Sequence, residues 1–483
     1  MFNKFNAEEL IYKIENIDLS NLNSQLDISF FVKNRVIPVE IGTDSIFVLS
    51  IVNDYNTISN IEHLTKRKCN LQIIDTNTFD FLFDKMVKRS RVVTNNLNLI
   101  SIQLGDDNKN IETINYLNKM IENAIIRGVS DIHIEPFKSS IRVRFRIDGK
   151  LVTQGTLRSD LYSIIITRMK ILAKLDITER RLPQDGRITF EFSKRDIDLR
   201  ISTIPTIYGE KIALRILDSE FKFKNLDSLG LGKENLEIIV NEITKLSGLI
   251  VVCGPTNSGK TTTIYSILNN INDESINIVT LEDPVEYKID GINQIQINYK
   301  TGLEFINTLN HILRQDPDVI SIGEIRDDET VQTALRAAIT GHFVFSTLHT
   351  SNSISAIYRL KDMKGESYLI SNALKLIISQ RLVRKLCPHC KKEYHVESSL
   401  IPHRQKIFRA VGCVRCNQGY SGRLGVFELL KIDNKIKYLI EKNASYDEIL
   451  LEAKKNGFKT LEENLIQSVI DGTTTLEEIM KII

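Results

Sequence analysis

The chain has 483 residues, 42% of them hydrophobic, which is enough for about three globular domains with buried cores. Its 63 basic and 61 acidic residues give a formal net charge of +2, which excludes a general electrostatic attraction to nucleic acid or to membrane surfaces. The first residues lack the apolar segment of a secretory signal, and no run of about 18 apolar residues could span a bilayer.

The first block of the chain, residues 1–105, is predicted to be a small N-terminal domain without catalytic residues. His63 and Cys69 are isolated in it, and isolated side chains of these types are more often packed or at the surface than bound to a ligand. A stretch rich in Asn and Asp, residues 93–110, predicts a linker to the next block.

The second block, residues 106–235, combines a helix pattern with strand patterns. Apolar residues recur at helical spacing from residue 114 to residue 125, and this helix is predicted to end near Gly128. Strict alternation over residues 141–148 predicts a half-buried antiparallel strand, which is closed by an Asp-Gly turn at Asp148.

Arginines lie on the polar side of the alternating strands in this block. Three further alternating runs, at residues 187–192, 197–202 and 211–217, each carry at least one. Solvation is the usual explanation for charges on a strand face, and spacing alone favours it. The alternative is an anion-facing surface that supplies arginine to a neighbouring subunit. The arginines concerned are Arg142, Arg144, Arg146, Arg187, Arg200 and Arg215.

The third block, residues 236–483, contains a phosphate-binding motif near its start. An apolar run at residues 249–253 predicts a buried strand, and helical spacing follows over residues 264–271. Between them lies a G-x-x-x-x-G-K-T match, and this strand-loop-helix context argues against a chance occurrence. The motif and the residue after it are Gly254, Pro255, Thr256, Asn257, Ser258, Gly259, Lys260, Thr261 and Thr262.

This motif predicts a site for a nucleoside triphosphate. Gly254 and Gly259 allow backbone N–H groups to curl around a phosphate, and the helix N-terminus adds partial positive charge. Lys260 would reach the β- and γ-phosphates, and the Thr261 hydroxyl would hold Mg²⁺.

Alternating strands and helices after the motif predict an α/β fold with a parallel sheet that is covered on both faces. Two of the predicted strands end directly before Glu282 and His349, and a third ends two residues before Glu324. Ligands bind at the carboxyl ends of the strands in such sheets, so these side chains are expected beside the phosphate loop. The predicted strands are residues 276–281, 319–322 and 343–348, and the predicted helices are residues 303–313 and 329–339.

These residue types suit phosphoryl transfer to water. The reaction needs held Mg²⁺, a group that orients the attacking water, and cations that stabilise the developing charge. Glu324 suits the metal shell or the water, Glu282 suits the water, and Lys260 suits the charge. The pattern does not decide which glutamate is the general base.

Four cysteines form two C-x2-C pairs separated by 22 residues. Two thiolate pairs at this spacing are typical of a tetrahedral Zn²⁺ site, and four protein ligands make the metal structural rather than catalytic. We also expect a reducing compartment, where clustered thiols more often bind metal than form disulfides. The cysteines are Cys387, Cys390, Cys413 and Cys416.

Together these motifs resemble the ATPases of type II secretion and type IV pilus assembly. The resemblance covers about residues 111–430 and rests on the order and spacing of several segments. Asn257 departs from it, since the family usually has Gly there, but Asn tolerates a left-handed backbone. The matching segments are the phosphate loop, an aspartate box at 279–286, a Walker B region at 313–327, a histidine box at 340–350, and residues 130–136, 181–187 and 208–210.

The resemblance implies a RecA-like core at residues 236–483 with a zinc-binding insertion at 386–425 and a helical C-terminal part. A PAS-like α+β domain at 106–235 and a small N-terminal partner-binding domain at 1–105 would precede it. ATP would lie between the two larger domains. The resemblance also implies that His349 reads the γ-phosphate, that Glu282 and Glu324 share catalysis, and that Arg144, Arg146 and Arg215 face the nucleotide.

The function that the resemblance implies is a cytoplasmic homohexameric ATPase, peripheral at the inner face of the bacterial inner membrane. It would power assembly of a secretion pseudopilus or a pilus by turning an inner-membrane platform protein beside cytoplasmic-facing assembly components. A DNA-uptake pilus motor or a RecA-like nucleic-acid motor are alternatives. The near-zero net charge argues against direct nucleic-acid binding. A third possibility, a regulatory nucleotide-binding module, is disfavoured by the paired glutamates.

Overall fold

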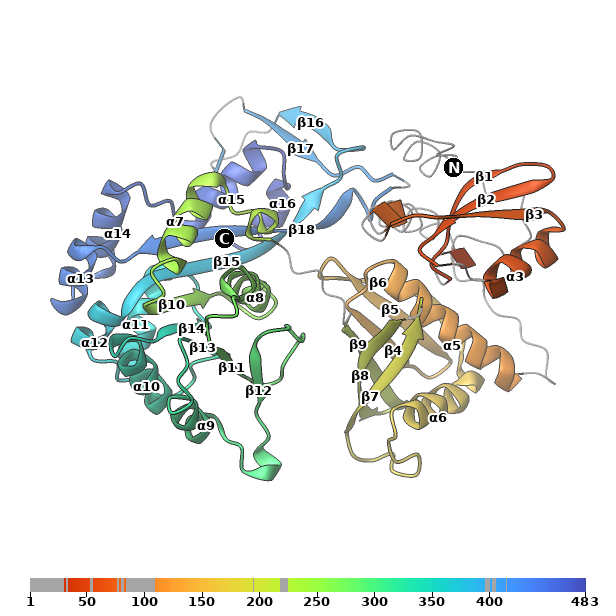
Figure 1. The fold of residues 1–483 in the computed structure, drawn as a ribbon, viewed down its shortest axis with the longest axis horizontal. Coiled ribbons are helices and arrows are strands. Elements are labelled where there is room, and N and C mark those ends of the chain that lie inside the picture. Colours follow the sequence, from red (N-terminus) through yellow and green to blue (C-terminus); the bar gives the residue numbers. More distant parts are fainter. Residues whose placement is uncertain are drawn as a thin grey trace. The chain divides into compact units, whose positions relative to one another are not determined.

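The computed structural model describes residues 30–31, 34–52, 55–75, 78–79, 82–83, 109–193, 195–217, 225–395, 400–401, 405–413 and 415–483. The chain divides into two compact units (Figure 1). The first comprises Met1–Ser219 with Cys413–Asn417, and the second comprises Glu220–Gly412 and Gln418–Ile483. Residues 93–108 of the predicted linker lie outside the described residues.

The N-terminal part contains a three-stranded sheet in the order β1-β2-β3, and helix α3 lies between β2 and β3 in the chain. Strands β1 and β2 are antiparallel, whereas β2 and β3 are parallel because α3 provides the crossover. Cys69 is buried in β3, and burial raises the pKa of its thiol to about 11, which suits a packed residue. The elements are β1 (Ile37–Ile41), β2 (Ser45–Ser50), α3 (Tyr55–Thr65) and β3 (Lys68–Ile73).

The second block forms a six-stranded antiparallel sheet in the order β6-β5-β4-β9-β8-β7. Alternation in β5 places Ile141, Val143 and Phe145 in the core, as predicted, and the Asp-Gly turn leads into β6. The elements are α5 (Lys109–Ile126), β4 (Asp131–Pro136), β5 (Ser140–Ile147), β6 (Lys150–Arg158), η3 (Ser159–Leu161), α6 (Tyr162–Leu172), β7 (Gln184–Phe192), β8 (Arg195–Thr206) and β9 (Gly209–Leu217).

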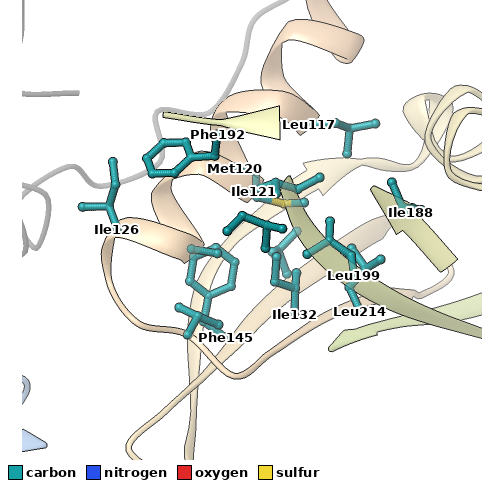
Figure 2. Packing of buried hydrophobic residues seen from close by; sticks show 14 of the residues in the cluster. Leu117, Met120, Ile121, Ile126, Ile132, Phe145, Ile188, Phe192, Leu199 and Leu214 are labelled. Carbon is teal, nitrogen blue, oxygen red and sulfur yellow. The ribbon is translucent and has the colours of Figure 1, made fainter. Parts of the chain in front are cut away.

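Apolar side chains of α5 fill one face of this sheet. Figure 2 shows Leu117, Met120 and Ile121 of the helix against Phe145 and Leu214 of the strands, and all five are almost fully buried. Burial of a side chain of this size contributes roughly 1.5–3 kcal/mol. The helical spacing that predicted α5 therefore also identified the side chains that hold it on the sheet.

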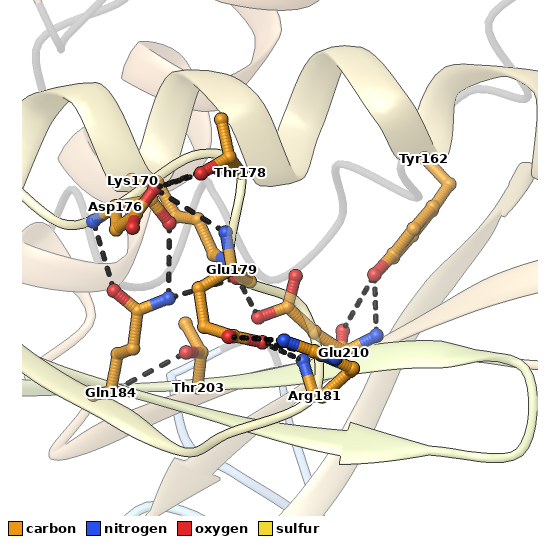
Figure 3. A network of polar contacts seen from close by, with 9 residues as sticks. All are labelled: Tyr162, Lys170, Asp176, Thr178, Glu179, Arg181, Gln184, Thr203 and Glu210. Carbon is orange, nitrogen blue, oxygen red and sulfur yellow. Dashed lines mark hydrogen bonds and ion pairs between the residues drawn. The ribbon is translucent and has the colours of Figure 1, made fainter.

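A polar network, buried at Lys170 and Glu210, ties the segment before β7 to α6 and β9 (Figure 3). The Lys170 ammonium lies 2.7 Å from a Glu210 carboxylate oxygen and donates to the Glu179 carbonyl at 2.6 Å. The Gln184 amide donates to the Asp176 and Glu179 carbonyls, both at 3.0 Å. Because Lys170 and Glu210 are 1% and 3% exposed, each charge depends on the other for compensation.

The second unit is built on a seven-stranded sheet in the order β12-β11-β13-β14-β10-β15-β18. All neighbouring pairs are parallel except β15 and β18, so the predicted parallel sheet has one antiparallel edge. The strands are β10 (Gly248–Cys253), β11 (Ile278–Glu282), β12 (Asn293–Gln296), β13 (Val319–Ile322), β14 (Phe343–Leu348), β15 (Leu374–Leu386) and β18 (Tyr420–Lys431).

Helices cover both faces of this sheet, as the continuous apolar strands predict. Along β10, Leu249 and Val251 join one hydrophobic cluster with α9–α12, whereas Ile250 and Val252 join another with α7 and α8. The elements around the sheet are η4 (Leu226–Leu229), α7 (Lys233–Ile243), α8 (Lys260–Ile271), η5 (Tyr299–Thr301), α9 (Phe305–Ile312), α10 (Asp328–Ile339), α11 (Ser353–Asp362) and α12 (Ser367–Ala373).

Strand β15 continues past the sheet core toward the cysteine-rich insertion. Beyond it lie the two-stranded sheet of β16 (Lys392–His395) and β17 (Lys406–Arg409) and the C-terminal helices. Arg384 of β15 makes a two-point ion pair with Glu478, at 2.8 and 2.6 Å, and stacks on Tyr420. The C-terminal helices are α13 (Asn434–Glu441), α14 (Tyr446–Lys455), α15 (Leu461–Ile470) and α16 (Leu476–Ile479).

Glu428 of β18 is a buried carboxylate, 3% exposed, that binds the N-termini of two helices. One oxygen accepts from the Ser353 backbone N–H at 2.6 Å, at the start of α11, and also from the Ser353 hydroxyl. The other accepts from the Leu461 N–H at 2.6 Å, at the start of α15. Negative charge is favoured at helix N-termini, so this side chain joins β18 to both helices.

Among the helices in the described residues, none combines the length and the apolar character that a membrane crossing requires.

Candidate active site

The phosphate loop connects β10 to α8, as the motif predicts. A Cβ atom on Gly254 would lie 2.6 Å from the Gln380 carbonyl oxygen, and one on Gly259 would lie 2.7 Å from the Gln380 side-chain nitrogen. Both glycines also have positive φ, so no other residue type fits either position without strain. Asn257 has a φ of 63°, so it adopts the left-handed conformation expected of it.

The side chains of the loop are arranged as a phosphate site requires. The Ser258 hydroxyl is buried and has no hydrogen-bond partner in the structure. The Lys260 ammonium donates to the Gly254 and Pro255 carbonyls at 2.7 and 3.1 Å, and burial lowers its pKa. Thr261 is exposed in the first turn of α8. The residues present therefore fit a bound polyphosphate, with Thr261 placed to hold a metal ion.

Three adjacent strands carry the predicted groups at their ends: Glu282 is the last residue of β11, Glu324 lies two residues after β13, and His349 directly follows β14. The Gly323 N–H donates to the Leu281 carbonyl at 2.8 Å, which joins the first two strand ends. The Gly254 N–H donates to the Leu348 carbonyl at 3.2 Å, which joins the third strand end to the phosphate loop. The predicted order of groups along one sheet edge is therefore present.

Glu324 is held between two nitrogen-bearing side chains. Arg326 donates to one of its carboxylate oxygens at 2.7 Å, and the His349 ring nitrogen lies 3.1 Å from the other. Its charge also acts on Lys260, whose pKa it raises against the larger effect of burial. The structure thus brings together Glu324, His349 and Lys260 from three separate predicted motifs.

Glu282 has a different environment, because it is 7% exposed and accepts only neutral hydrogen bonds. Thr280 donates to it at 2.6 Å and Gln294 at 3.2 Å, and Tyr265 of α8 donates to its second oxygen. Burial raises the pKa of Glu282, although these donors oppose the shift. A carboxyl with a raised pKa is suited to proton transfer near neutral pH.

Sequence patterns alone missed three residues around the loop: Tyr265, Gln380 and Arg381. The Gln380 side chain accepts from Thr263 at 2.7 Å, and the Arg381 guanidinium donates to the Gln380 and Ser351 carbonyls. For Gln380 and Arg381, their polar character within the apolar run of β15 was the available signal, whereas Tyr265 lies in α8. Their partners lie far away in the sequence, so no local spacing could have identified them.

The three predicted nucleotide-facing arginines lie on the polar face of the six-stranded sheet of the first unit. Arg144 pairs with Glu135 at 2.6 Å, while Arg146 and Arg215 both pair with Asp131, at 3.4 and 3.1 Å. The strand register also places Arg187 opposite Arg200, and Arg200 opposite Arg215. Their role toward a nucleotide stays a prediction.

The four cysteines of the insertion come together, and their sulfur atoms all lie within 4.8 Å of one another. Those of Cys413 and Cys416 are 3.7 Å apart. Tetrahedral Zn²⁺ with bonds of about 2.3 Å to sulfur separates its ligands by about 3.8 Å. The donor set therefore fits a zinc ion.

Comparisons with known proteins identify the family of the chain. The family model described as "Type II/IV secretion system protein" matches residues 106–481. A type IV pilus assembly ATPase, PilB, of Pseudomonas aeruginosa is 37% identical over 475 residues, covering 93% of this chain and 84% of the relative. The type II secretion system ATPase E of Vibrio cholerae is 42% identical over 377 residues, covering 76% of this chain and 75% of the relative.

Solved structures give the same result for the fold. The pilus retraction motor PilT with bound ADP superimposes with a TM-score of 0.54 at 30% identity, covering 76% of this chain and 96% of that one. The ATPase DotB of Legionella pneumophila, at 20% identity and a TM-score of 0.58, covers 76% of this chain and 95% of its own and supports the fold alone.

Proposed function

This chain belongs to the type II/IV secretion system protein family, and from that membership we propose that it is a hexameric motor that assembles a type II secretion pseudopilus or a type IV pilus. As a member of this ATPase family, it is an ATP-hydrolysing enzyme. The observation that carries the proposal is the phosphate loop with Glu324, His349 and Lys260 gathered beside it. It would act at the inner face of the bacterial inner membrane, on a platform protein.

In the proposed reaction, Lys260 binds the β- and γ-phosphates, and Thr261 holds Mg²⁺, which supplies positive charge at the phosphate oxygens. The attacking water loses a proton to a carboxylate while its oxygen bonds to the γ-phosphorus. The bond from that phosphorus to the bridging oxygen breaks, and ADP and phosphate leave. His349 is placed to contact the γ-phosphate from its position beside Glu324.

We assign the role of general base to Glu282. To Glu324 we assign the positioning of the phosphate and the metal ion. The Arg326 guanidinium pairs with Glu324 and compensates its negative charge, and the other carboxylate oxygen of Glu324 lies beside His349. Glu282 is buried among neutral donors, and its raised pKa favours acceptance of a proton. Arg144, Arg146 and Arg215 are proposed to face the nucleotide in the assembled hexamer.

The proposal is tested by Mg-ATP hydrolysis measured against protein concentration, for wild type and Glu324→Gln. We expect the rate per subunit to rise with concentration, because arginines of a neighbouring subunit would complete the site on assembly. Glu324→Gln should be almost inactive at every concentration. A rate per subunit that is independent of concentration, together with an active Glu324→Gln, would refute both the oligomeric motor and the site.

We also propose that the cysteine cluster holds one structural Zn²⁺. Metal analysis of the purified protein should give about one zinc per chain, because four thiolates close a tetrahedral site. Cys387→Ser should lose most of the zinc and lower the melting temperature. Cys69→Ser is the matched control, since Cys69 lies outside the cluster, and it should keep the zinc. Metal-free wild type that melts at the same temperature would contradict the proposal.

A further inference from the structure

Tyr265 connects the helix of the phosphate loop to Glu282. The residue lies five positions after Lys260 in α8, and its side chain is 3% exposed. Its hydroxyl donates to the Glu282 carboxylate and accepts from the Glu286 backbone N–H at 3.4 Å. Its ring contacts Tyr287 edge to face, with the ring centroids 6.4 Å apart. The side chain therefore joins α8 to Glu282 and to the loop that follows it.

The other two donors to Glu282 come from the sheet. Thr280 lies on the same strand, β11, and Gln294 lies on the edge strand β12. Gln294 also binds the loop after Glu282, because it donates to the Tyr287 carbonyl and accepts from the Ile289 N–H. Of the three donors, Tyr265 alone belongs to the helix that begins at the phosphate loop.

We propose that Tyr265 is a positioning residue for hydrolysis: its hydroxyl fixes the Glu282 carboxylate relative to the phosphate loop. The inference rests on the proposed role of Glu282 as general base. Efficient proton transfer requires the base at hydrogen-bond distance from the water, and a small misplacement costs a large factor in rate. Through this hydrogen bond, any movement of α8 would also move the carboxylate of Glu282.

The electrostatics of the site agree with this role. Burial raises the pKa of Glu282, and the charge of Glu286 raises it further. The hydroxyls of Thr280 and Tyr265 and the amide of Gln294 lower it, because each donates to the charged form. Burial also raises the pKa of Tyr265, so its hydroxyl remains a donor.

The test is Tyr265→Phe, which removes one oxygen and keeps the ring. We expect kcat for ATP to fall by roughly 10- to 100-fold while KM stays within about threefold, because binding by the phosphate loop is intact. The acidic limb of the pH profile of kcat should move to higher pH, because a lost donor raises the pKa of the base. The deficit should therefore shrink as the pH rises.

Two further variants separate the possible outcomes. Tyr358→Phe is the matched control, since it removes a tyrosine hydroxyl that donates to the Ala444 carbonyl at 2.8 Å, and it should keep the wild-type pH profile. Glu282→Gln tests the base itself, and retained activity there would refute the assignment of Glu282. An inactive Glu282→Gln with a wild-type rate and pH limb for Tyr265→Phe would overturn the role of Tyr265 alone.

Discussion

Replacing Lys260 by alanine is expected to lower ATP hydrolysis by on the order of 10³-fold, because the loop loses the cation that meets the transferred phosphoryl group. Burial lowers the pKa of this ammonium, yet Glu324 opposes that shift, and two backbone carbonyls hold the group in the loop. The measurement is kcat with saturating Mg-ATP. If Lys260→Ala hydrolyses ATP near the wild-type rate, the phosphate loop is not the catalytic site.

Two control variants test whether the loss of activity comes from this particular ammonium group. Lys364→Ala removes an exposed lysine of the same unit, whose ammonium pairs with Asp328, and it should leave the rate unchanged. Lys260→Arg keeps the charge but changes its shape, and a planar guanidinium does not replace a compact ammonium inside a tight loop. It should therefore recover little activity, although the melting temperature of both Lys260 variants should stay close to that of wild type.

Replacing Glu428 by glutamine should lower the stability of the second unit by about 3 kcal/mol. The change keeps the size of the side chain but exchanges an acceptor oxygen for an amide that donates, and buried N–H groups of Ser353 or Leu461 lose their partner. Each unsatisfied buried donor costs about 1–3 kcal/mol. For a unit of this size, the loss corresponds to a drop in melting temperature of roughly 5–10 °C.

Thermal unfolding followed by circular dichroism measures this effect. Glu441→Gln is the matched control, because Glu441 also accepts from a serine hydroxyl, that of Ser371, but lies at the surface. That variant should melt within about 2 °C of wild type, as surface substitutions usually do. Equal melting temperatures for Glu428→Gln and wild type would mean that the two helix N-termini do not depend on this carboxylate.

Much of the second unit was predictable from local patterns. Strands β10, β11, β13 and β14 were predicted because continuous apolar runs of this length end in polar residues. Strand β12 was not predicted, since its sequence Asn-Gln-Ile-Gln contains no apolar run. Where the observed bounds of a strand differ from the predicted ones, tertiary contacts explain the difference. Strand β11 begins at Ile278 rather than at residue 276, because Asn277 bonds instead to Asp318 and to the turn before β13.

The antiparallel edge strand of the seven-stranded sheet and the side-chain contacts inside the candidate active site were not predictable from the sequence. Strand β15 carries Gln380, Arg381 and Arg384 within its apolar run, so neither alternation nor a continuous apolar pattern identifies it. The partners of Glu428 lie 75 and 33 residues away, and those of Tyr265 lie 17 and 21 residues away. Such contacts form only when the chain folds, so the spacing of residues in the sequence does not indicate them.

The length of β15 has a mechanical consequence. The strand runs for 13 residues, about 44 Å when extended, and is paired with β18 along most of that length. Near the middle of the strand, Gln380 accepts from Thr263 in the helix that begins at the phosphate loop, and farther along Arg384 pairs with Glu478 of α16. The regular pairing with β18 restricts bending from Leu376 to Arg384, where the register then shifts before Leu386. A displacement of the phosphate loop and its helix would therefore be transmitted along this paired segment to Arg384 and, through its ion pair with Glu478, to α16.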